Sequence, residues 1–489
     1  MSAIARRTKI LATLGPATDG PGVLDDLVRA GVNVVRLNFS HGKPADHAAR
    51  IQAVREAAER QGREVGILAD LQGPKIRIER FAAGKVSLAV GDAFDLVCRA
   101  DTPPGDRHGV GVSYLGLVND VRAGDVLLLD DGLMALRVDG IEGDVVHTRV
   151  LTDGTLSDRK GLNRLGGGLS LGALTDQDKE HIRIAADLGV DFLAVSFCRS
   201  AADLHEARSL VEAAGGRHVA IVAKIERAEA IDNLVEITIA SDAVMVARGD
   251  LGVEIGDAEL PGLQKKIIRT ALEHNRVVIT ATQMLQSMVD NPIPTRAEVL
   301  DVANAVIDGT DAVMLSAETA SGNHPVKAVE AMVRICLGAE RQFDRMDDFS
   351  KAPRNLQRAD QAIAMASMFL AEHVDVRAII ALTESGGTAR FLSRFRSESP
   401  IFALSRHAGA RRRMALMRDV YPIAFDSRGL ATREAARTAI RQLFQLQLLS
   451  EGDRVLITGG DHMEKHGTTN TLRLLQVGPE GVAQGLGEL

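Results

Sequence analysis

Short apolar runs alternate along the chain with stretches in which apolar residues recur at helical spacing. An apolar run bounded by polar residues is typical of a strand buried on both faces. Eight runs have this form: Lys9 to Leu14, Val32 to Leu37, Val65 to Ala69, Phe192 to Ser196, Val219 to Ala223, Ala243 to Val246, Val277 to Thr280 and Ala312 to Leu315. Amphipathic segments separate most of them, at Pro44 to Arg60, Asp176 to Leu188, Ala201 to Ala214, Pro261 to His274 and Thr295 to Asp308. Eight strand and helix units predict an α/β fold, a closed (β/α)8 or TIM barrel.

A doubly wound open sheet is the alternative architecture for such alternation. Its dinucleotide-binding form would carry GxGxxG after the first strand, whereas Gly15 stands in GPATDG. The closed barrel is therefore the favoured interpretation.

Residues 73–168 interrupt the alternation. From about Pro74 to Gly168 helical periodicity is missing, and short alternating runs (KVSLAV, FDLV, DVLLLD, MALRV, VVHTRV) are separated by Gly and Asp turns. They predict a small antiparallel β domain, a β-barrel inserted after the third strand of the main barrel. An insertion there hangs over the catalytic face and is placed to close as a lid that excludes water. The main barrel would then consist of residues 1–72 and 169–344.

A third domain is predicted at residues 345–489. The polar stretch DRMDDFSKAPRNLQ, which begins at Asp344, has the composition of a linker. Beyond it the pattern predicts helix Ala359 to Ala371, strand Ala378 to Thr383, helix Thr388 to Phe395, strand Ile401 to Ser405 and, after further alternation, strand Val455 to Thr458. This order is typical of a doubly wound α/β domain.

Composition narrows the class of protein. With 489 residues, 45% hydrophobic and 25% charged, the chain has the composition of a globular protein of two to four domains. The first residues lack the apolar core of a signal peptide and no run is long enough to span a membrane, so a cytoplasmic protein is expected. Three cysteines without CxxC spacing indicate neither disulfides nor a zinc site.

Nucleic acid is not an expected partner. The net charge of −7 gives no general attraction to it, and Trp is absent. Thirteen arginines stand against five acids between Arg377 and Arg441, but an RNA-binding patch would also carry aromatics, so a solvated basic helix face is as good a reading.

The richest chemistry lies between Val219 and Gly256. One apolar run there ends in Lys224 and Glu226, and the next ends in Arg248, Gly249 and Asp250. Strand ends of a parallel barrel meet on one face, where a cation and two carboxylates would hold a divalent metal and a phosphoryl group. The alternative is that the acids only form ion pairs with Lys224 and Arg248.

Polar side chains follow other predicted strands. Arg36, Asn38 and Ser40 alternate after the second strand and therefore share a face, which suits a phosphate or a cation. An arginine capping a strand end, with Asn and Ser in the turn, explains this motif equally well. After the third strand Gly73-Pro74 forces a turn, and Lys75 and Arg77 then point the same way.

The last two barrel strands also end in polar groups. Thr282 follows the seventh and Ser316 the eighth. A solitary polar residue after a strand is more often a solvated loop residue than a catalyst. Six of eight strands with such ends favour a catalytic barrel.

Seven segments, in order, resemble the motifs of the pyruvate kinase family over essentially the whole chain. They are KILATLGPAT, NVVRLNFSHG, ILADLQGPKIR, IVAKIERAEAI, VMVARGDLGVEIG, ITATQMLQSM and DGTDAVMLSAETASG. The resemblance implies a barrel with an inserted lid and a C-terminal regulatory domain, assembled as a homotetramer. It also implies phosphoryl transfer from phosphoenolpyruvate to ADP, giving pyruvate and ATP.

The resemblance assigns catalytic roles. Lys224, at the position of the family's catalytic lysine, would neutralise charge on the migrating phosphoryl group. Glu226 and Asp250 would hold Mg²⁺ or Mn²⁺, and the backbone N–H groups of Gly249 and Asp250 would receive the substrate carboxylate. Thr282 and Ser316 would protonate the enolate through a water relay, because neither hydroxyl is acidic enough to act alone.

Phosphate and nucleotide contacts also follow from the resemblance. Arg36 would grip the transferred phosphate beside Lys224. Arg77 and, from the lid, Lys160 would grip phosphates on the nucleotide side, where Asn38 and His41 also match.

Lys75 departs from the best-known members of the family. Many pyruvate kinases need a monovalent cation, held by residues matching Asn38, Ser40 and Asp70 and by the carbonyl of Leu71, with glutamate in the position of Lys75. A fixed ammonium would supply the charge that K⁺ otherwise brings and would repel K⁺. We therefore expect activity independent of K⁺, as in the lysine-bearing bacterial branch of the family.

A second binding loop is expected in the C-terminal domain. Thr383 precedes a hydroxyl- and glycine-rich turn that opens a helix, a general phosphate cradle, and Gly467 lies in a loop that would close over the ligand. The turn, with Ser385, Gly386, Gly387 and Thr388, resembles the family's sugar-phosphate effector loop, although Gly387 stands where a basic residue often occurs. Since the Trp-bearing loop associated with fructose 1,6-bisphosphate is missing, we expect a sugar monophosphate activator.

Two other functions fit part of the pattern. A metal-dependent lyase or aldolase that acts on an enolate would use the same barrel, lysine and carboxylates, but would not need the lid or several phosphate-binding cations. A non-catalytic sugar-phosphate sensor would explain the C-terminal domain alone.

Overall fold

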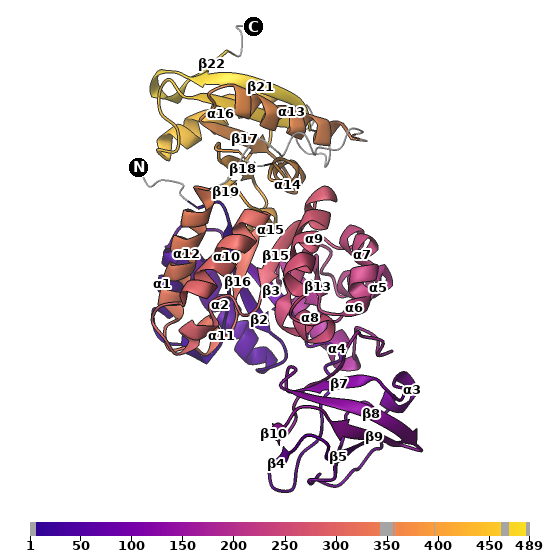
Figure 1. Cartoon of the computed structure of the whole chain (residues 1–489). Coiled ribbons are helices and arrows are strands. Elements are labelled where there is room, and N and C mark those ends of the chain that lie inside the picture. The colour runs from indigo at the N-terminus through magenta and orange to yellow at the C-terminus, as the bar shows by residue number, and fades with distance from the viewer. Residues whose placement is uncertain (1–5, 343–355, 357, 396, 461–468, 486–489) are drawn as a thin grey trace.

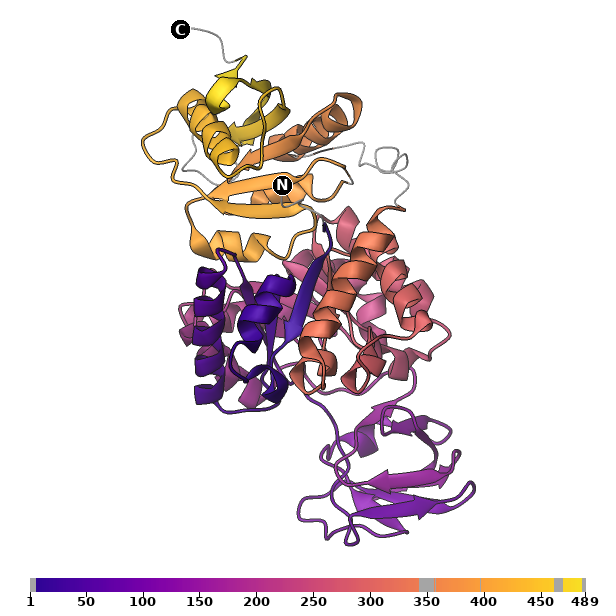
Figure 2. The ribbon, with the colours of Figure 1, turned by 90° about the vertical axis from the view of Figure 1, so that its left-hand side faces the viewer.

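The computed structural model describes residues 6–342, 356, 358–395, 397–460 and 469–485. A closed barrel occupies the middle of the molecule (Figure 1), with a small β domain extending from one end and a C-terminal α/β domain covering the other. The same arrangement is seen after a quarter turn (Figure 2). No helix in these described ranges has the length and apolar character needed to cross a lipid bilayer.

Eight parallel strands close the barrel in the order β1-β16-β15-β14-β13-β12-β3-β2, which confirms the predicted TIM barrel. Each predicted apolar run overlaps one strand: β1 Lys9–Thr13, β2 Val34–Asn38, β3 Gly66–Asp70, β12 Phe192–Val195, β13 Ala220–Ile225, β14 Ala243–Ala247, β15 Val277–Ala281 and β16 Ala312–Leu315. The strands are buried on both faces, because side chains fill the barrel inside and helices cover it outside.

Helices surround the barrel. They are α1 Val23–Ala30, α2 Pro44–Arg60, α4 Asp176–Asp187, α5 Ala201–Ala213, α6 Ala228–Asp232, α7 Leu234–Ala240, α8 Arg248–Ile255, α9 Leu260–Glu273, α10 Arg296–Asp308, α11 Ala317–Ala320 and α12 Pro325–Glu340. Local sequence fixes several starts: Thr175 and Thr295 each accept a hydrogen bond from the backbone N–H three residues on, in a capping box.

Four polar residues recur at the barrel floor, by which we mean the N-terminal ends of the eight strands. Asn33, Asp191, Asp242 and Asp311 each immediately precede a strand, and a side-chain oxygen of each accepts a hydrogen bond from the neighbouring strand. The donors are, in the same order, the backbone N–H groups of Ile10, Ile67, Ile221 and Val278, at 3.1, 2.9, 2.8 and 2.9 Å.

Arginines of the C-terminal domain bind two of these acids. Arg412 pairs with Asp191 at 2.7 Å, and Arg394 pairs with Asp311. The backbone N–H of Arg418 also donates to Asp311, at 3.0 Å. The barrel floor is therefore the surface on which the C-terminal domain is anchored.

The inserted β domain has a core of its own. Its strands are β4 Lys85–Leu88, β5 Ala93–Val97, β6 Gly109–Gly111, β7 Val126–Leu129, β8 Met134–Glu142, β9 Val145–Val150, β10 Gly154–Ser157 and β11 Leu162–Arg164. A six-stranded sheet runs β11-β7-β8-β9-β5-β6, beside the pair β10-β4. Hence the expected small barrel is a partial one.

Two details of this domain differ from the expected antiparallel, helix-free pattern. β5 and β6 are parallel, because the connection between them returns the chain to the same end of the sheet. A short helix, α3 Leu117–Asp120, also interrupts the strands. Its single turn is too short to give a helical period in the sequence.

The C-terminal domain is the expected α/β unit. Its strands are β17 Ala378–Leu382, β18 Ile401–Ser405, β19 Val420–Ala424, β20 Arg454–Gly460, β21 Thr469–Val477 and β22 Ala483–Gln484, and its helices α13 Ala359–His373, α14 Gly387–Leu392, α15 Ala408–Met414 and α16 Thr432–Gln445. The order β19-β18-β17-β20 is parallel, and β21 and β22 add an antiparallel edge. Most of the predicted linker lies outside the described residues.

Candidate active site

Polar side chains from several barrel strands meet at the end opposite the barrel floor. Lys224, near the end of β13, lies at the centre of this group. Its Nζ is 2.8 Å from Oε1 of Glu226 and 3.2 Å from Oδ1 of Asp70, and it donates a hydrogen bond to Oγ of Ser196 at 2.7 Å. Burial alone would lower the pKa of Lys224, but the two carboxylates raise it above its ordinary value. Lys224 is thus a fixed cation.

Asp70 stands between two cations. Nε of Arg36 is 2.6 Å from Oδ2 of Asp70, while Lys224 approaches the other oxygen. Burial would raise the pKa of Asp70, but Lys224 and Arg36 lower it, so the carboxylate stays ionised. Arg36 also donates to Oγ1 of Thr13 at 3.2 Å. Asp70 therefore aims both cations into the site.

Glu226 and Asp250 have the chemistry of a divalent metal site. Glu226 is buried, and its Oε2 accepts the backbone N–H of Phe197 at 2.8 Å. Burial raises the pKa of Glu226, and the negative charge of nearby Asp250 raises it further against the opposing effect of Lys224. Two carboxylates that repel each other and offer hard oxygen ligands fit Mg²⁺ or Mn²⁺, which need one or two such ligands and take the rest from substrate and water.

Arg248 binds backbone carbonyl oxygens and Asp301, and does not form the ion pair with Asp250 that the sequence offered as an alternative. Its guanidinium donates to the carbonyl oxygens of Thr282 at 2.8 Å and Gln283 at 3.2 Å, and it pairs with Asp301 at 2.7 Å. Thr282 and Gln283 have φ angles of 69° and 52°, a left-handed backbone unfavourable for side chains of this kind. Arg248 holds this strained turn in place and is not the ion-pair partner of Asp250.

Thr282 and Gly249 contact each other directly. The backbone N–H of Gly249 donates to Oγ1 of Thr282 at 2.7 Å, and that hydroxyl donates to the carbonyl of Ala281 at 2.6 Å. A substrate carboxylate at the Gly249 amide would therefore have to replace the threonine hydroxyl.

A cleft of about 680 Å³ opens beside these groups. Arg36, Asn38, His41, Thr282 and Ser316 line it, so it gathers five of the residues selected from the sequence. The Oγ of Ser316 is buried and has no hydrogen-bond partner within the described part of the chain. It remains available to a substrate or a water in the cleft.

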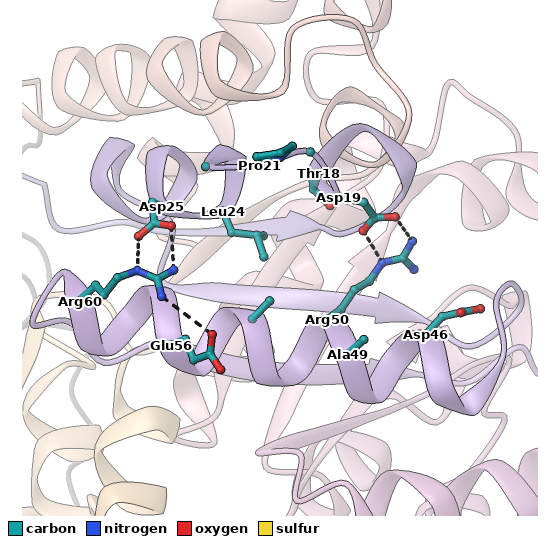
Figure 3. Close-up of a pocket in the computed structure, with 13 residues that line it drawn as sticks. Thr18, Asp19, Pro21, Leu24, Asp25, Asp46, Ala49, Arg50, Glu56 and Arg60 are labelled. Carbon is teal, nitrogen blue, oxygen red and sulfur yellow. Dashed lines mark hydrogen bonds and ion pairs between the residues drawn. The ribbon is translucent and has the colours of Figure 1, made fainter.

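A second groove, of about 550 Å³, lies between α1 and α2, beside the cleft (Figure 3). Ion pairs cross it: Arg50 binds Asp19 with two hydrogen bonds of 2.8 and 2.7 Å, and Arg60 binds Asp25 with two of 2.9 and 2.8 Å. Arg50 lines both spaces. The Arg50–Asp19 pair ties the loop before α1 to α2, the Arg60–Asp25 pair ties α1 itself to α2, and Arg50 lies in the wall of the cleft.

Comparison with known proteins decides the family. The model "Pyruvate kinase, barrel domain" matches residues 5–329, and "Pyruvate kinase, alpha/beta domain" matches residues 361–475. Pyruvate kinase II of Salmonella typhimurium is 53% identical over 98% of this chain and 100% of its own length. The chain belongs to the pyruvate kinase family. Pyruvate kinases of Haemophilus influenzae and Bacillus licheniformis are 50% and 41% identical, over 94% and 99% of this chain and 97% and 82% of their own. The protein is thus a phosphotransferase, a pyruvate kinase.

Two residues predicted to bind the nucleotide, Arg77 and Lys160, lie in the lid of this pyruvate kinase, apart from the barrel site. Nη1 of Arg77 donates to the carbonyl of Arg159 at 3.0 Å, and Lys160 pairs with Asp130 at 2.8 Å. Figures 1 and 2 show the lid extended away from the barrel. Lys75, at the base of the lid, does reach the site, with Nζ 3.3 Å from Oδ1 of Asp250.

Glu254 of α8, the helix that carries Asp250, contacts both the lid and α6. The backbone N–H of Gly166 donates to the carbonyl of Glu254 at 2.8 Å, and the Glu254 carboxylate accepts the N–H of Ala228 at 2.9 Å. Burial raises the pKa of Glu254 to about 7. A titratable group therefore lies where the lid meets the helix that carries Asp250.

The predicted effector loop follows β17. The backbone N–H of Gly386 donates to Oγ1 of Thr383 at 3.0 Å, and the Thr388 hydroxyl is 2.6 Å from that of Thr469 at the start of β21. Ser385 lies in the same turn, and Gly387 is the first residue of α14. Gly467 lies outside the described residues.

Two residues of the site were missed in the sequence. Ser196 accepts a hydrogen bond from the Lys224 ammonium and donates one to the carbonyl of Leu71 at 2.8 Å. The Thr13 hydroxyl accepts a hydrogen bond from Arg36. Both lie at or just after the C-terminal end of a barrel strand, β12 for Ser196 and β1 for Thr13. The rule that found Thr282 would have found them too, had it been applied to every strand.

Proposed function

We propose that the chain transfers a phosphoryl group from phosphoenolpyruvate to ADP with Mg²⁺ or Mn²⁺, giving pyruvate and ATP. The observation that carries the proposal is the Lys224 ammonium, fixed between Asp70, Glu226 and Ser196 at the catalytic face of the barrel. Phosphoryl transfer has little covalent chemistry to assist, so a fixed cation beside the migrating group is the main contribution a protein can make.

The neighbouring residues supply the rest of the chemistry. Lys224 and Arg36 would bind the phosphoryl oxygens, with Asp70 orienting both. Glu226 and Asp250 would hold the metal ion, which when bound supplies positive charge to the phosphate and carboxylate oxygens.

Protonation and nucleotide binding complete the reaction. Thr282 and Ser316, which line one cleft, would pass a proton through water to the enolate carbon. Asn38 and His41 line the same cleft and would contact ADP, while Arg77 and Lys160 would reach its phosphates when the lid closes.

A coupled assay tests this function. With phosphoenolpyruvate, ADP and Mg²⁺ we expect pyruvate and ATP in equal amounts. Lys224→Met should lower the rate by about 10³-fold or more, while Lys266→Met, which removes an exposed lysine of α9, should not. Cleavage of an enolate-derived substrate without ATP formation would instead indicate a lyase.

We also propose that K⁺ is not required. The Lys75 ammonium already lies beside Asp250, and the would-be K⁺ ligands are engaged: Asp70 by Arg36 and Lys224, and the Leu71 carbonyl by Ser196. Dependence of the rate on KCl tests this proposal.

A sugar monophosphate is the proposed activator at the loop from Thr383 to Thr388. Its support is the turn that leads into α14, with hydroxyl groups at Thr383 and Ser385 in the turn and at Thr388 in the first turn of the helix. The half-saturating phosphoenolpyruvate concentration should fall with glucose 6-phosphate or ribose 5-phosphate and not with fructose 1,6-bisphosphate. No response to any of the three would contradict regulation at this loop.

We also propose that the chain assembles as a homotetramer, which sedimentation equilibrium would check.

A further inference from the structure

A cavity of about 200 Å³ lies between the barrel floor and the C-terminal domain. The first residues of β12, β13, β14 and β15 form its barrel side, together with Asp242. Residues 385–387 of the effector loop, Arg390 of α14 and Arg413 of α15 line the opposite side. We call this space the floor cavity.

The floor cavity has cations without matching anions. Nη1 of Arg413 donates to a neutral acceptor, the carbonyl of His218, at 3.0 Å. Nε of Arg390 is buried and, within the described part of the chain, has no hydrogen-bond partner. Burial, together with the like charge of neighbouring Arg276, lowers the pKa of Arg390 to about 10. A buried guanidinium in this state would gain from an added negative charge.

Asp242 does not balance these charges. Its Oδ2 already accepts the backbone N–H of Ile221 at 2.8 Å and pairs with Arg208 at 2.9 Å. Arg276, which also adjoins Asp242, donates to the neutral carbonyls of Thr238 and Ile239. The single carboxylate of Asp242, which also accepts a backbone hydrogen bond from β13, is thus surrounded by several arginines.

We propose that the floor cavity binds a phosphate-sized divalent oxyanion, held by Arg390 and Arg413. Guanidinium groups bind phosphate oxygens through paired N–H donors. The volume lies below the roughly 300–1,000 Å³ of sites for larger ligands, which favours inorganic phosphate or the phosphate group of a small ester over a nucleotide.

The floor cavity shares Ser385, Gly386 and Gly387 with the proposed effector loop but contacts them from the barrel side. The Thr388 hydroxyl, which is 2.6 Å from that of Thr469 in β21, does not line the cavity. An anion in the cavity would join the effector loop to the start of the barrel strands whose other ends carry Lys224 and Asp250. The proposal does not depend on the identity of the activator or on catalysis.

Equilibrium dialysis of the full chain against labelled inorganic phosphate tests the proposal. Arg390→Gln and Arg413→Gln should each weaken one phosphate site per chain by about tenfold or more. Arg437→Gln, the same change on an exposed part of α16, should bind like the wild type. Thr388→Val, which removes the effector-loop hydroxyl, should also keep the site.

Several results would overturn the proposal. They are unchanged binding in both cavity variants, equal weakening in Arg437→Gln, or loss of the same site in Thr388→Val. Wild-type crystals grown with selenate give a measurement that needs no variant, and we expect an anomalous peak between Arg390 and Arg413. The lack of that peak would also count against the site. Displacement of labelled phosphate by ribose 5-phosphate would assign a phosphate ester, and retention would assign the inorganic ion.

Discussion

Replacing Lys75 should make the activity, which we propose to be independent of K⁺, depend on K⁺. Nζ of Lys75 is 3.3 Å from Oδ1 of Asp250, and the two side chains are 27% and 25% exposed. Coulomb's law gives about 5 kcal/mol at this distance for an effective dielectric constant of ~20 and about 1.3 kcal/mol in bulk water. Because both side chains are a quarter exposed, screening places the effect in the lower half of this range, about 1.5–3 kcal/mol.

This energy corresponds to a rate change of roughly 10- to 100-fold. Without K⁺, kcat/KM for phosphoenolpyruvate should fall by this factor in Lys75→Met and by more in Lys75→Glu, which reverses the charge beside Asp250. KCl should restore much of the activity of Lys75→Glu, since the new carboxylate can hold K⁺ beside the metal site. Wild type should respond little.

Initial rates of pyruvate formation provide the measurement, in tetramethylammonium chloride and in KCl at equal ionic strength. Lys266→Glu is the matched control, because it makes the same charge reversal on the exposed face of α9. A wild-type enzyme nearly inactive without KCl would refute the reasoning. So would full K⁺-free activity in Lys75→Glu.

Three further predictions concern the proton path, the lid hinge and the domain anchor. Ser316→Ala should slow deuterium uptake into pyruvate in heavy water by about 10²-fold with an unchanged Tm, since its Oγ has no protein partner to lose in the described ranges; normal uptake would exclude Ser316 from the relay. Burial raises the pKa of Glu254 from 4.5 to about 7, so the folded state holds this proton more tightly than the unfolded chain. The contribution of this proton to the free energy of unfolding is complete below pH ~4.5 and is lost as the pH rises through ~7. The loss amounts to no more than about 3 kcal/mol. Glu254→Gln should remove this part of the fall in Tm between pH 5 and 8, and identical Tm profiles would contradict it. Arg412→Gln should lower the free energy of unfolding in urea by about 1–3 kcal/mol, because Asp191 keeps Arg55 as a second partner; an unchanged denaturation midpoint would show that this anchor contributes little.

The barrel and most of its site were predictable from sequence for a simple physical reason. Strands buried on both faces must be apolar, so the first polar residue after each run marks the C-terminal end of a strand, as it does for Lys224 and Thr282. Side-chain partners do not follow from such a pattern. Arg248 stands one residue after a strand like any candidate, yet it binds the backbone of Thr282 and Gln283.

Long-range pairing escaped prediction for the same reason. The contact of Asp70 with Lys224 joins residues far apart in the sequence, and only closure of the barrel brings them together. In the lid, strand positions were visible as alternating runs, but the parallel pairing of β5 with β6 depends on the path of a connection that carries no periodic signal.

The acids of the barrel floor limit how far this chain can be shortened. Asp311 is 1% exposed, and its cation comes from Arg394, 83 residues further along the chain. A chain truncated before the C-terminal domain would lose this arginine together with the residues that cover the carboxylate. The same cut would expose to water the apolar core that the barrel floor shares with the C-terminal domain, and burial of such surface is the main term that holds a domain folded. The TIM barrel, often regarded as self-sufficient, is here completed by the C-terminal domain.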